Sequence, residues 1–238
     1  MIVWLTAALA GTLTPPITQD FDGDGKPETV ALKDEKLLVP PIADLWCSEG
    51  MCHFEVVDVA SDKPGKELVV CQSGPRDESS CSLLRYAKGV WATSTFPAVL
   101  GGGPSRIIAT GNGIVLGVYE DRWYSRVEKM TWTDGALTHV KQPLLSTVTE
   151  QRPTGWNWKV DRSFPIFDAP GGKAIVANVA PGKDAAVVAE SPTHLYAAEY
   201  DDNKRWLLVR TQSGLLGWAT LASIIASSDA LTMVNSAG

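Results

Sequence analysis

The sequence is poor in the residues and motifs that support catalysis. It has three histidines, His53, His139 and His194, and none stands in an H-E-x-x-H pattern. It also lacks a G-x-S-x-G elbow, a phosphate-binding P-loop and a glycine-rich dinucleotide fingerprint. Adjacent acidic residues such as Glu120 and Asp121 point to opposite faces of a strand, so they do not converge on one bond. These absences predict that the protein is not an enzyme and acts by binding.

An excess of positive charge and a long apolar run are also missing. The 238 residues include 21 Lys and Arg against 27 Asp and Glu, which gives a net charge of -6. A mildly acidic chain lacks the basic patch that nucleic acid requires. No apolar run approaches the length that a membrane-spanning helix needs. We therefore predict no nucleic-acid partner and no transmembrane segment.

The first ten residues have the features of a secretory signal. Residues 2–10 form a short apolar run that ends in Ala8-Leu9-Ala10, the small-x-small pattern of a signal-peptidase site. We predict that residues 1–10 are a signal peptide and that the protein is exported to the periplasm or the extracellular space. No Lys or Arg precedes the run, so the start of a buried strand or helix is the alternative.

Four cysteines agree with an oxidising compartment. Cys47 and Cys52 bracket one turn-like segment, and Cys71 and Cys81 bracket another. Four cysteines allow three connectivities, and the short loops favour the pairs Cys47–Cys52 and Cys71–Cys81. The alternative is a zinc site of four thiolates, although the spacing C-x4-C…C-x9-C is poor for zinc.

Strand patterns dominate the sequence, and the predicted fold class is all-β. Short segments rich in β-branched and aromatic residues are separated by Gly, Pro, Asp and Asn. An Asp-Gly turn at 134–135 predicts a hairpin between 123–132 and 137–140. No helical period is sustained, and we assign its closest instance, 218–225, to a β-barrel. The predicted strands are 29–32, 36–39, 54–57, 67–70, 106–109, 113–119 and 123–132.

A weak repeat runs through the first part of the chain. Residues 20–32 read DFDGDGKPETVAL, and residues 58–70 read DVASDKPGKELVV. Gly111-Asn112-Gly113, before another β run, is a possible third copy. A period near 40 residues is typical of one four-stranded propeller blade, but three copies are too few to close an ordinary propeller. Residues 14–145 are therefore predicted to form a propeller-like or a sandwich-like β domain.

The first copy of the repeat carries a pattern of calcium ligands. Ca²⁺ takes six to eight hard oxygen ligands, and carboxylates at alternate positions curl around one point. Asp20, Asp22 and Asp24 supply side-chain oxygens, Lys26 its backbone carbonyl, and Glu28 closes the shell. We predict a structural Ca²⁺ at these five residues.

This loop resembles the calcium loops of FG-GAP/VCBS-type repeats, in which D-x-D-G-D-G precedes a strand. It differs from an EF-hand, because Ala31 occupies the twelfth position where the bidentate Glu is required. The second copy keeps Asp58, Asp62 and Glu67 but loses the alternation and the paired glycines. We interpret that copy as a structural turn, and a solvated acidic turn is the alternative for the first.

The last third of the chain resembles a bacterial SH3 (SH3b) domain. Residues 146–158 are predicted as a linker, 159–226 as the SH3b domain, a small barrel, and 227–238 as a frayed tail. Four family landmarks occur in order: Ile166-Phe167-Asp168-Ala169-Pro170, Pro181-Gly182, Trp206-Leu207-Leu208-Val209 and Gly217-Trp218-Ala219.

The resemblance implies recognition of peptides or cell-wall material in an aromatic-lined groove. Candidate groove residues are Tyr196, Tyr200, Trp206 and Trp218, although the core is the favoured place for Trp218. The function predicted is a non-catalytic, exported binding or scaffold protein. The alternatives are a cell-wall hydrolase with an unrecognised site and an interaction subunit of an envelope complex.

Overall fold

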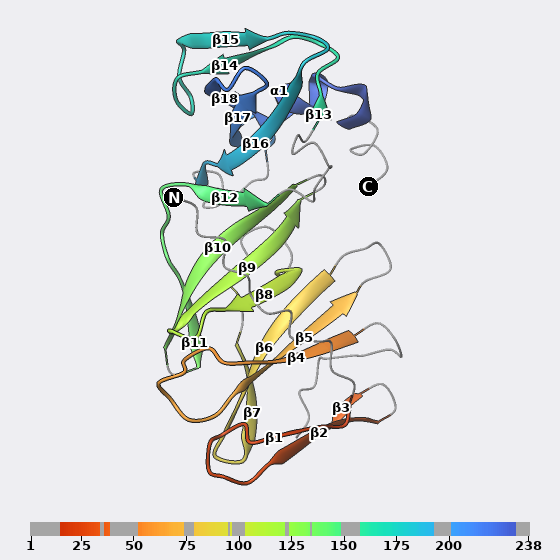
Figure 1. Ribbon diagram of the computed structural model, residues 1–238, viewed down its shortest axis with the longest axis vertical. Helices are drawn as coiled ribbons and strands as arrows, with labels where there is room; N and C mark the ends of the chain where they lie inside the picture. Colours follow the sequence, from red (N-terminus) through yellow and green to blue (C-terminus); the bar gives the residue numbers. More distant parts are fainter. Residues whose placement is uncertain are drawn as a thin grey trace. The chain divides into compact units, whose positions relative to one another are not determined.

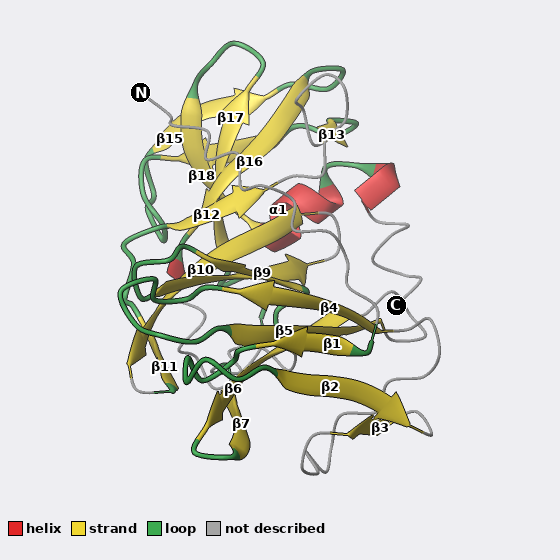
Figure 2. Ribbon diagram, turned by 60° about the horizontal axis from the view of Figure 1, so that its bottom comes forward, coloured by secondary structure: helices red, strands yellow, loops and turns green. Residues whose placement is uncertain are grey.

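The computed structural model describes residues 15–33, 36–38, 52–73, 79–94, 96, 103–121, 124–133, 135–148, 158–192 and 201–231. The described chain is all-β, with antiparallel sheets and short helical segments (Figure 2). The predicted signal peptide 1–10 lies outside these residues, as do Cys47, His194, Tyr196 and Tyr200. The all-β prediction is confirmed.

The chain divides into two compact units. The N-terminal unit comprises residues 1–97, 103–116 and 130–139, and the C-terminal unit comprises 98–102, 117–129 and 140–238. A strand, β12 (Leu145–Val148), covers the end of the predicted N-terminal domain and the start of the predicted linker. The chain therefore does not divide at segment 146–158, which belongs to the C-terminal unit.

The N-terminal unit is built from short antiparallel sheets (Figure 1). Each of the three repeated loops connects two successive strands, at 20–27, 58–66 and 110–113. The weak sequence repeat thus has a structural counterpart. No pairing among the described strands closes these sheets into a propeller ring. One sheet consists of β1 (Ile17–Gln19), β2 (Glu28–Lys33) and β3 (Lys36–Leu38), and another of β4 (Cys52–Val57), β5 (Glu67–Ser73), β6 (Ser79–Ala87) and β7 (Val90–Ser94). The next four strands, β8 (Arg106–Ala109), β9 (Ile114–Asp121), β10 (Tyr124–Thr133) and β11 (Ala136–His139), belong to a larger sheet.

Strand β5 explains why this unit has two core clusters. Side chains alternate between the faces of a strand. Leu68 and Val70 pack in a cluster with Phe21 and Phe54, and Val69 packs in a second cluster on the other face. A strand buried on both faces must be apolar throughout, which accounts for the run of hydrophobic residues in β5.

The cysteines that the structure describes are all in disulfides. Cys71 and Cys81 face each other across β5 and β6, with a Cα–Cα distance of 4.0 Å, and form the predicted disulfide. Cys52 is also disulfide-bonded. Its predicted partner, Cys47, lies outside the described residues. The bond between Cys71 and Cys81 removes the alternative of a zinc site built from four thiolates.

The largest sheet that the structure describes has eleven antiparallel strands in the order β15-β14-β18-β17-β16-β12-β10-β9-β8, in which β11 also pairs with β10 and β13 with β16. The predicted pairing of 187–189 with 206–210 is confirmed, since Val187 lies opposite Val209. No pairing among the described strands closes this sheet into a barrel. The remaining strands are β13 (Trp158–Lys159), β14 (Phe164–Phe167), β15 (Ile175–Val179), β16 (Asp184–Glu190), β17 (Trp206–Thr211) and β18 (Leu216–Thr220).

The chain after β18 differs from the prediction. Segment 218–225 was expected to belong to a barrel, but only its start lies in β18, and α1 (Leu221–Ala226) follows. Thr220 begins this helix, because its hydroxyl accepts a hydrogen bond from the Ser223 amide at 3.2 Å. Leu221, Ile224 and Ile225 are buried. Three apolar side chains on one face make this short helix part of the core.

The predicted frayed tail 227–238 begins inside the fold. The carbonyl of Ser227 accepts hydrogen bonds from the amides of Asp161 at 2.8 Å and Arg162 at 2.9 Å. Leu231 is 5% exposed and packs in the core of the C-terminal unit. The prediction is therefore wrong for residues 227–231. Main-chain hydrogen bonds hold the start of this segment, and a sequence of mostly small polar residues does not indicate such bonds.

Candidate functional site

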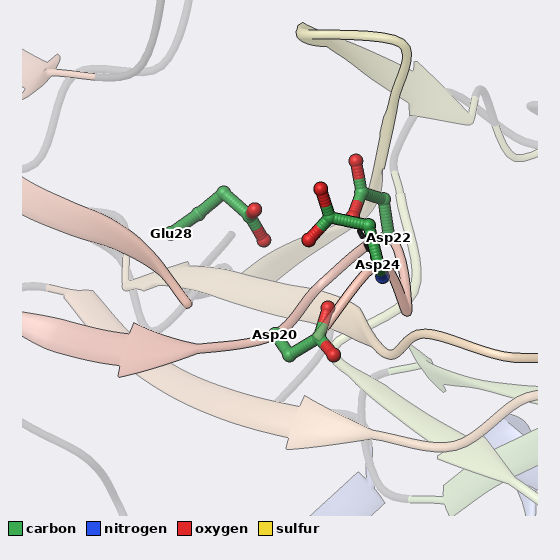
Figure 3. A group of neighbouring side chains, drawn as sticks. All are labelled: Asp20, Asp22, Asp24 and Glu28. Atoms are coloured by element: carbon green, nitrogen blue, oxygen red, sulfur yellow. Dashed lines mark hydrogen bonds between the residues drawn. The ribbon is translucent and has the colours of Figure 1, made fainter. Parts of the chain in front are cut away.

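The acidic loop between β1 and β2 gathers four carboxylates. Asp20, Asp22, Asp24 and Glu28 each offer an oxygen, and these oxygens all lie within 4.8 Å of one another. Figure 3 shows Asp22 and Asp24 next to each other, with the Glu28 carboxylate facing them. Ca²⁺–O bonds are about 2.3–2.6 Å long, so opposite ligands of one ion are about 4.6–5.2 Å apart. A single ion can therefore contact all four side chains.

Main-chain hydrogen bonds hold this loop in its curled shape. The amides of Gly23 and Gly25 donate to the two Asp20 oxygens at 2.7 and 2.9 Å, and the Phe21 amide donates to Glu28 Oε2 at 2.7 Å. Both glycines have a positive φ, 77° and 86°, which other residues rarely adopt. A carboxylate accepts about four hydrogen bonds or ligands in all. The carboxylates consequently retain lone pairs for a metal ion.

Lys26 takes part in the loop through its main chain, whereas the acidic residues take part through their side chains. Its amide donates to Asp24 Oδ1 at 2.7 Å, and its side chain is exposed. No ion pair joins Lys26 to the four carboxylates. The loop therefore concentrates negative charge, and the cations Lys63, Arg85 and Lys88 lie in the lining of the cavity next to Asp22 and Asp24.

The second repeated loop has the same hydrogen bond from a loop amide to a glutamate, but its charged side chains are paired differently. The Val59 amide donates to Glu67 Oε2 at 3.1 Å, as the Phe21 amide does to Glu28. Here, however, the ammonium of Lys66 forms an ion pair with Asp58. Burial raises the pKa of the Glu67 carboxyl above its usual range. The second loop thus supplies its own cation.

The three repeated loops are joined through their main chains. The Lys66 amide donates to the Phe21 carbonyl at 3.0 Å, and the Gly113 amide donates to the Val59 carbonyl at 2.7 Å. The Ser61 amide donates to the Gly111 carbonyl at 2.9 Å. Main-chain hydrogen bonds therefore connect the acidic loop to the second loop, and the second loop to the third.

The predicted aromatic groove is only partly described. Trp206 is half-buried and packs edge-to-face on Phe167, with ring centroids 5.8 Å apart. Trp218 is 9% exposed and lies opposite Leu208 in the sheet. Trp218 is thus a core residue with little surface for a ligand, whereas part of Trp206 is accessible. Tyr196 and Tyr200 lie outside the described residues.

A groove that the sequence did not reveal lies at the end of the C-terminal sheet. Its volume is about 400 Å³, and it is lined by 177–180, Lys183 and residues of the turn 211–215. β15 is the terminal strand of this sheet and pairs only with β14 among the described strands. One exposed apolar side chain, Leu215 (48%), lines the groove, and the strands β15 and β18 carry three more, Ile175 (56%), Val176 (46%) and Leu216 (51%). An uncharged apolar stretch between Lys173 and Lys183 is the sequence signal that could have indicated it.

The C-terminal unit also buries a charged network that the sequence did not reveal. Glu190 and Arg205 are both 0% exposed. Arg205 Nε donates to Glu190 Oε1 at 3.0 Å, and the Tyr124 hydroxyl donates to Glu190 Oε2 at 2.9 Å. Because a fully buried and hydrogen-bonded pair is inaccessible to a ligand, we assign it to the structure and not to a site.

Comparisons of the chain with protein-family models, with curated proteins and with solved structures give no match. The likenesses to FG-GAP/VCBS repeats and to SH3b domains therefore stay predictions. None of the helices in the described part of the chain has the length and apolar character required to cross a membrane.

Proposed function

We propose that the protein is an exported, non-catalytic binding protein of the cell envelope. Its C-terminal unit is the recognition module and takes the peptide part of cell-wall material in the manner of an SH3b domain. The observation that carries this proposal is the groove of about 400 Å³ beside the apolar edge of β15. The Cys71–Cys81 disulfide supports export, because such bonds persist in oxidising compartments.

The groove suits an extended peptide. The outer edge of β15 offers main-chain N–H and C=O groups to an added strand. Ile175 and Val176 supply exposed apolar contact, and the ammonium of Lys183 lies at the groove for an acidic group of the peptide. Backbone pairing gives affinity to such a complex, and the flanking side chains give selectivity.

The N-terminal unit is proposed to be a calcium-stabilised support. Asp20, Asp22, Asp24 and Glu28 hold one Ca²⁺ through side-chain oxygens, and Lys26 adds its carbonyl. The support for this proposal is the mutual distance of the four carboxylates. Extracellular calcium modules bind in the range of about 10⁻⁴–10⁻³ M, which suits a structural ion outside the cell.

The experiment is a pull-down on purified peptidoglycan, run beside a turbidity-clearing assay. Val176→Asp places a charge at the β15 edge, and Val90→Asp makes the same change at a site that is 60% exposed in the N-terminal unit. We expect the wild type and Val90→Asp to bind without clearing, and Val176→Asp to bind at least tenfold more weakly. Equal binding by both variants would contradict the assigned groove.

The same assays distinguish the two alternative functions. Clearing that a single carboxylate substitution abolishes would establish a cell-wall hydrolase. Neither binding nor clearing would favour an interaction subunit that contacts another envelope protein.

A further inference from the structure

A second cavity lies beside the acidic loop, within the N-terminal unit. Its volume is about 390 Å³, which is within the range of small-ligand sites. Asp22 and Asp24 contribute to its lining, as do Arg85 from β6 and Lys88 from the turn between β6 and β7. The ring of Tyr86 also lines this cavity and is half-buried. The cavity thus combines carboxylates, cations and an aromatic ring.

Arg85 is the unusual group in this lining. It is half-buried, and its guanidinium attracts the Glu67 carboxylate but makes no hydrogen bond or ion pair with any residue that the structure describes. Its cross-strand neighbour is Glu67, whose carboxylate accepts a hydrogen bond from the Val59 amide. A guanidinium has five N–H donors in a fixed fork that matches a carboxylate. Arg85 therefore presents unused donors beside the cavity.

The charge of the cavity depends on the loop. Three cations (Lys63, Arg85 and Lys88) and three carboxylates (Asp22, Asp24 and Glu67) line the cavity, so their formal charges balance while the loop holds no metal. A divalent ion on the loop would outweigh that balance and leave the cavity positive, since a bound ion is the largest local charge in such a site. The same residues would then attract an anion.

We propose that this cavity binds a carboxylate-bearing sugar, a uronic acid, and that Ca²⁺ on the acidic loop strengthens this binding. The inference rests on the calcium role given under the proposed function. Arg85 and Lys88 take the carboxylate, and the Tyr86 ring packs on the sugar. By linkage, the sugar acid strengthens calcium binding by the same factor as calcium strengthens sugar binding.

The test is calorimetry on the whole chain with D-glucuronate as the probe, in Ca²⁺ and in chelator, and with glucose as the uncharged control. The expected result is glucuronate binding that is at least tenfold tighter in Ca²⁺, with no binding of glucose. Arg85→Gln and the exposed variant Lys88→Gln should each weaken glucuronate binding severalfold while Ca²⁺ alone still binds. Lys173→Gln removes an exposed cation of the C-terminal unit and should behave as the wild type.

Two results would overturn the inference. If Ca²⁺ binds but glucuronate does not, or binds equally well to Arg85→Gln and Lys88→Gln, the sugar-acid site is wrong and the calcium role stands. If Ca²⁺ alone does not bind the wild type, both the calcium role and the proposed coupling between calcium and sugar-acid binding are wrong.

Discussion

The acidic loop and the second repeated loop share one main-chain hydrogen bond to a glutamate but differ in how their charged side chains are paired. In both, a glutamate at the start of the second strand accepts a hydrogen bond from an amide near the start of the loop, Phe21 for Glu28 and Val59 for Glu67. The second loop then pairs Asp58 with Lys66, whereas the first gathers four carboxylates within 4.8 Å of one another. The proposed calcium site therefore rests on the carboxylates of the first loop and not on the main-chain hydrogen bond that both loops share.

The largest effect is expected from a steric test of how the two loops dock. Gly23 and Gly25 both have positive φ, but a Cβ on Gly23 would collide with Pro64 of the second loop, while a Cβ on Gly25 meets nothing within 4 Å. Gly25→Ala should cost about 1–2 kcal/mol for the left-handed backbone alone. Gly23→Ala should cost about 1–3 kcal/mol more through overpacking. Urea denaturation of both variants measures the difference, and equal losses would show that the loops do not dock through Gly23.

Removal of calcium is expected to have the next largest effect. An ion present at 100 times its Kd stabilises the folded state by about 2.7 kcal/mol, so a chelator should lower the Tm of the wild type by several degrees. Asp24→Asn should abolish most of this response. Asp58→Asn, the matched change in the second loop, should keep it. A wild-type Tm that is the same with calcium and with chelator would remove the proposed difference between the loops.

Substitution of Lys66 tests whether the second loop relies on its own cation. Lys66→Met removes the partner of Asp58, and both side chains are partly exposed, so the expected loss is about 1 kcal/mol or less. The loss should be the same in calcium and in chelator, because this loop lacks the alternating carboxylates. Recovery of stability on addition of calcium would mean that the second loop also binds metal once the lysine is gone.

The smallest effect is a pH dependence at Glu67. Burial raises its pKa in the folded state, so the stability from this group is fully present below the unfolded pKa and is lost as pH rises through the folded pKa. Glu67→Gln keeps an acceptor for the Val59 amide and removes the titration. The variant should match the wild type near pH 4 and be more stable at pH 7, by less than about 0.5 kcal/mol. Urea denaturation at both pH values checks this, and a variant that is less stable at pH 7 would contradict it.

Local patterns were sufficient for much of the N-terminal unit. The alternation of Asp20, Asp22 and Asp24 predicted a curled loop, and the structure brings these residues together with Glu28. The Asp-Gly turn predicted the β10–β11 hairpin, in which Thr133 lies opposite Ala136. These features depend on residues close in sequence, so spacing alone indicates them.

Features that depend on distant residues were not predictable. Arg205 lies 81 residues from Tyr124, and only the sheet pairing brings both to Glu190. The groove beside β15 requires the turn 211–215 to reach a strand some 35 residues earlier in the chain. Helix α1 was missed because its six residues are too few to establish a helical period.

Isothermal titration of the metal-free protein with Ca²⁺ tests the central claim most directly. The account predicts one ion per chain for the wild type, one ion for the double variant Asp58→Asn/Asp62→Asn, and none for Asp22→Asn/Asp24→Asn. The second-loop variant controls for the simple loss of two negative charges. Absence of binding to the wild type, or binding that survives in Asp22→Asn/Asp24→Asn, would contradict a calcium site in the acidic loop.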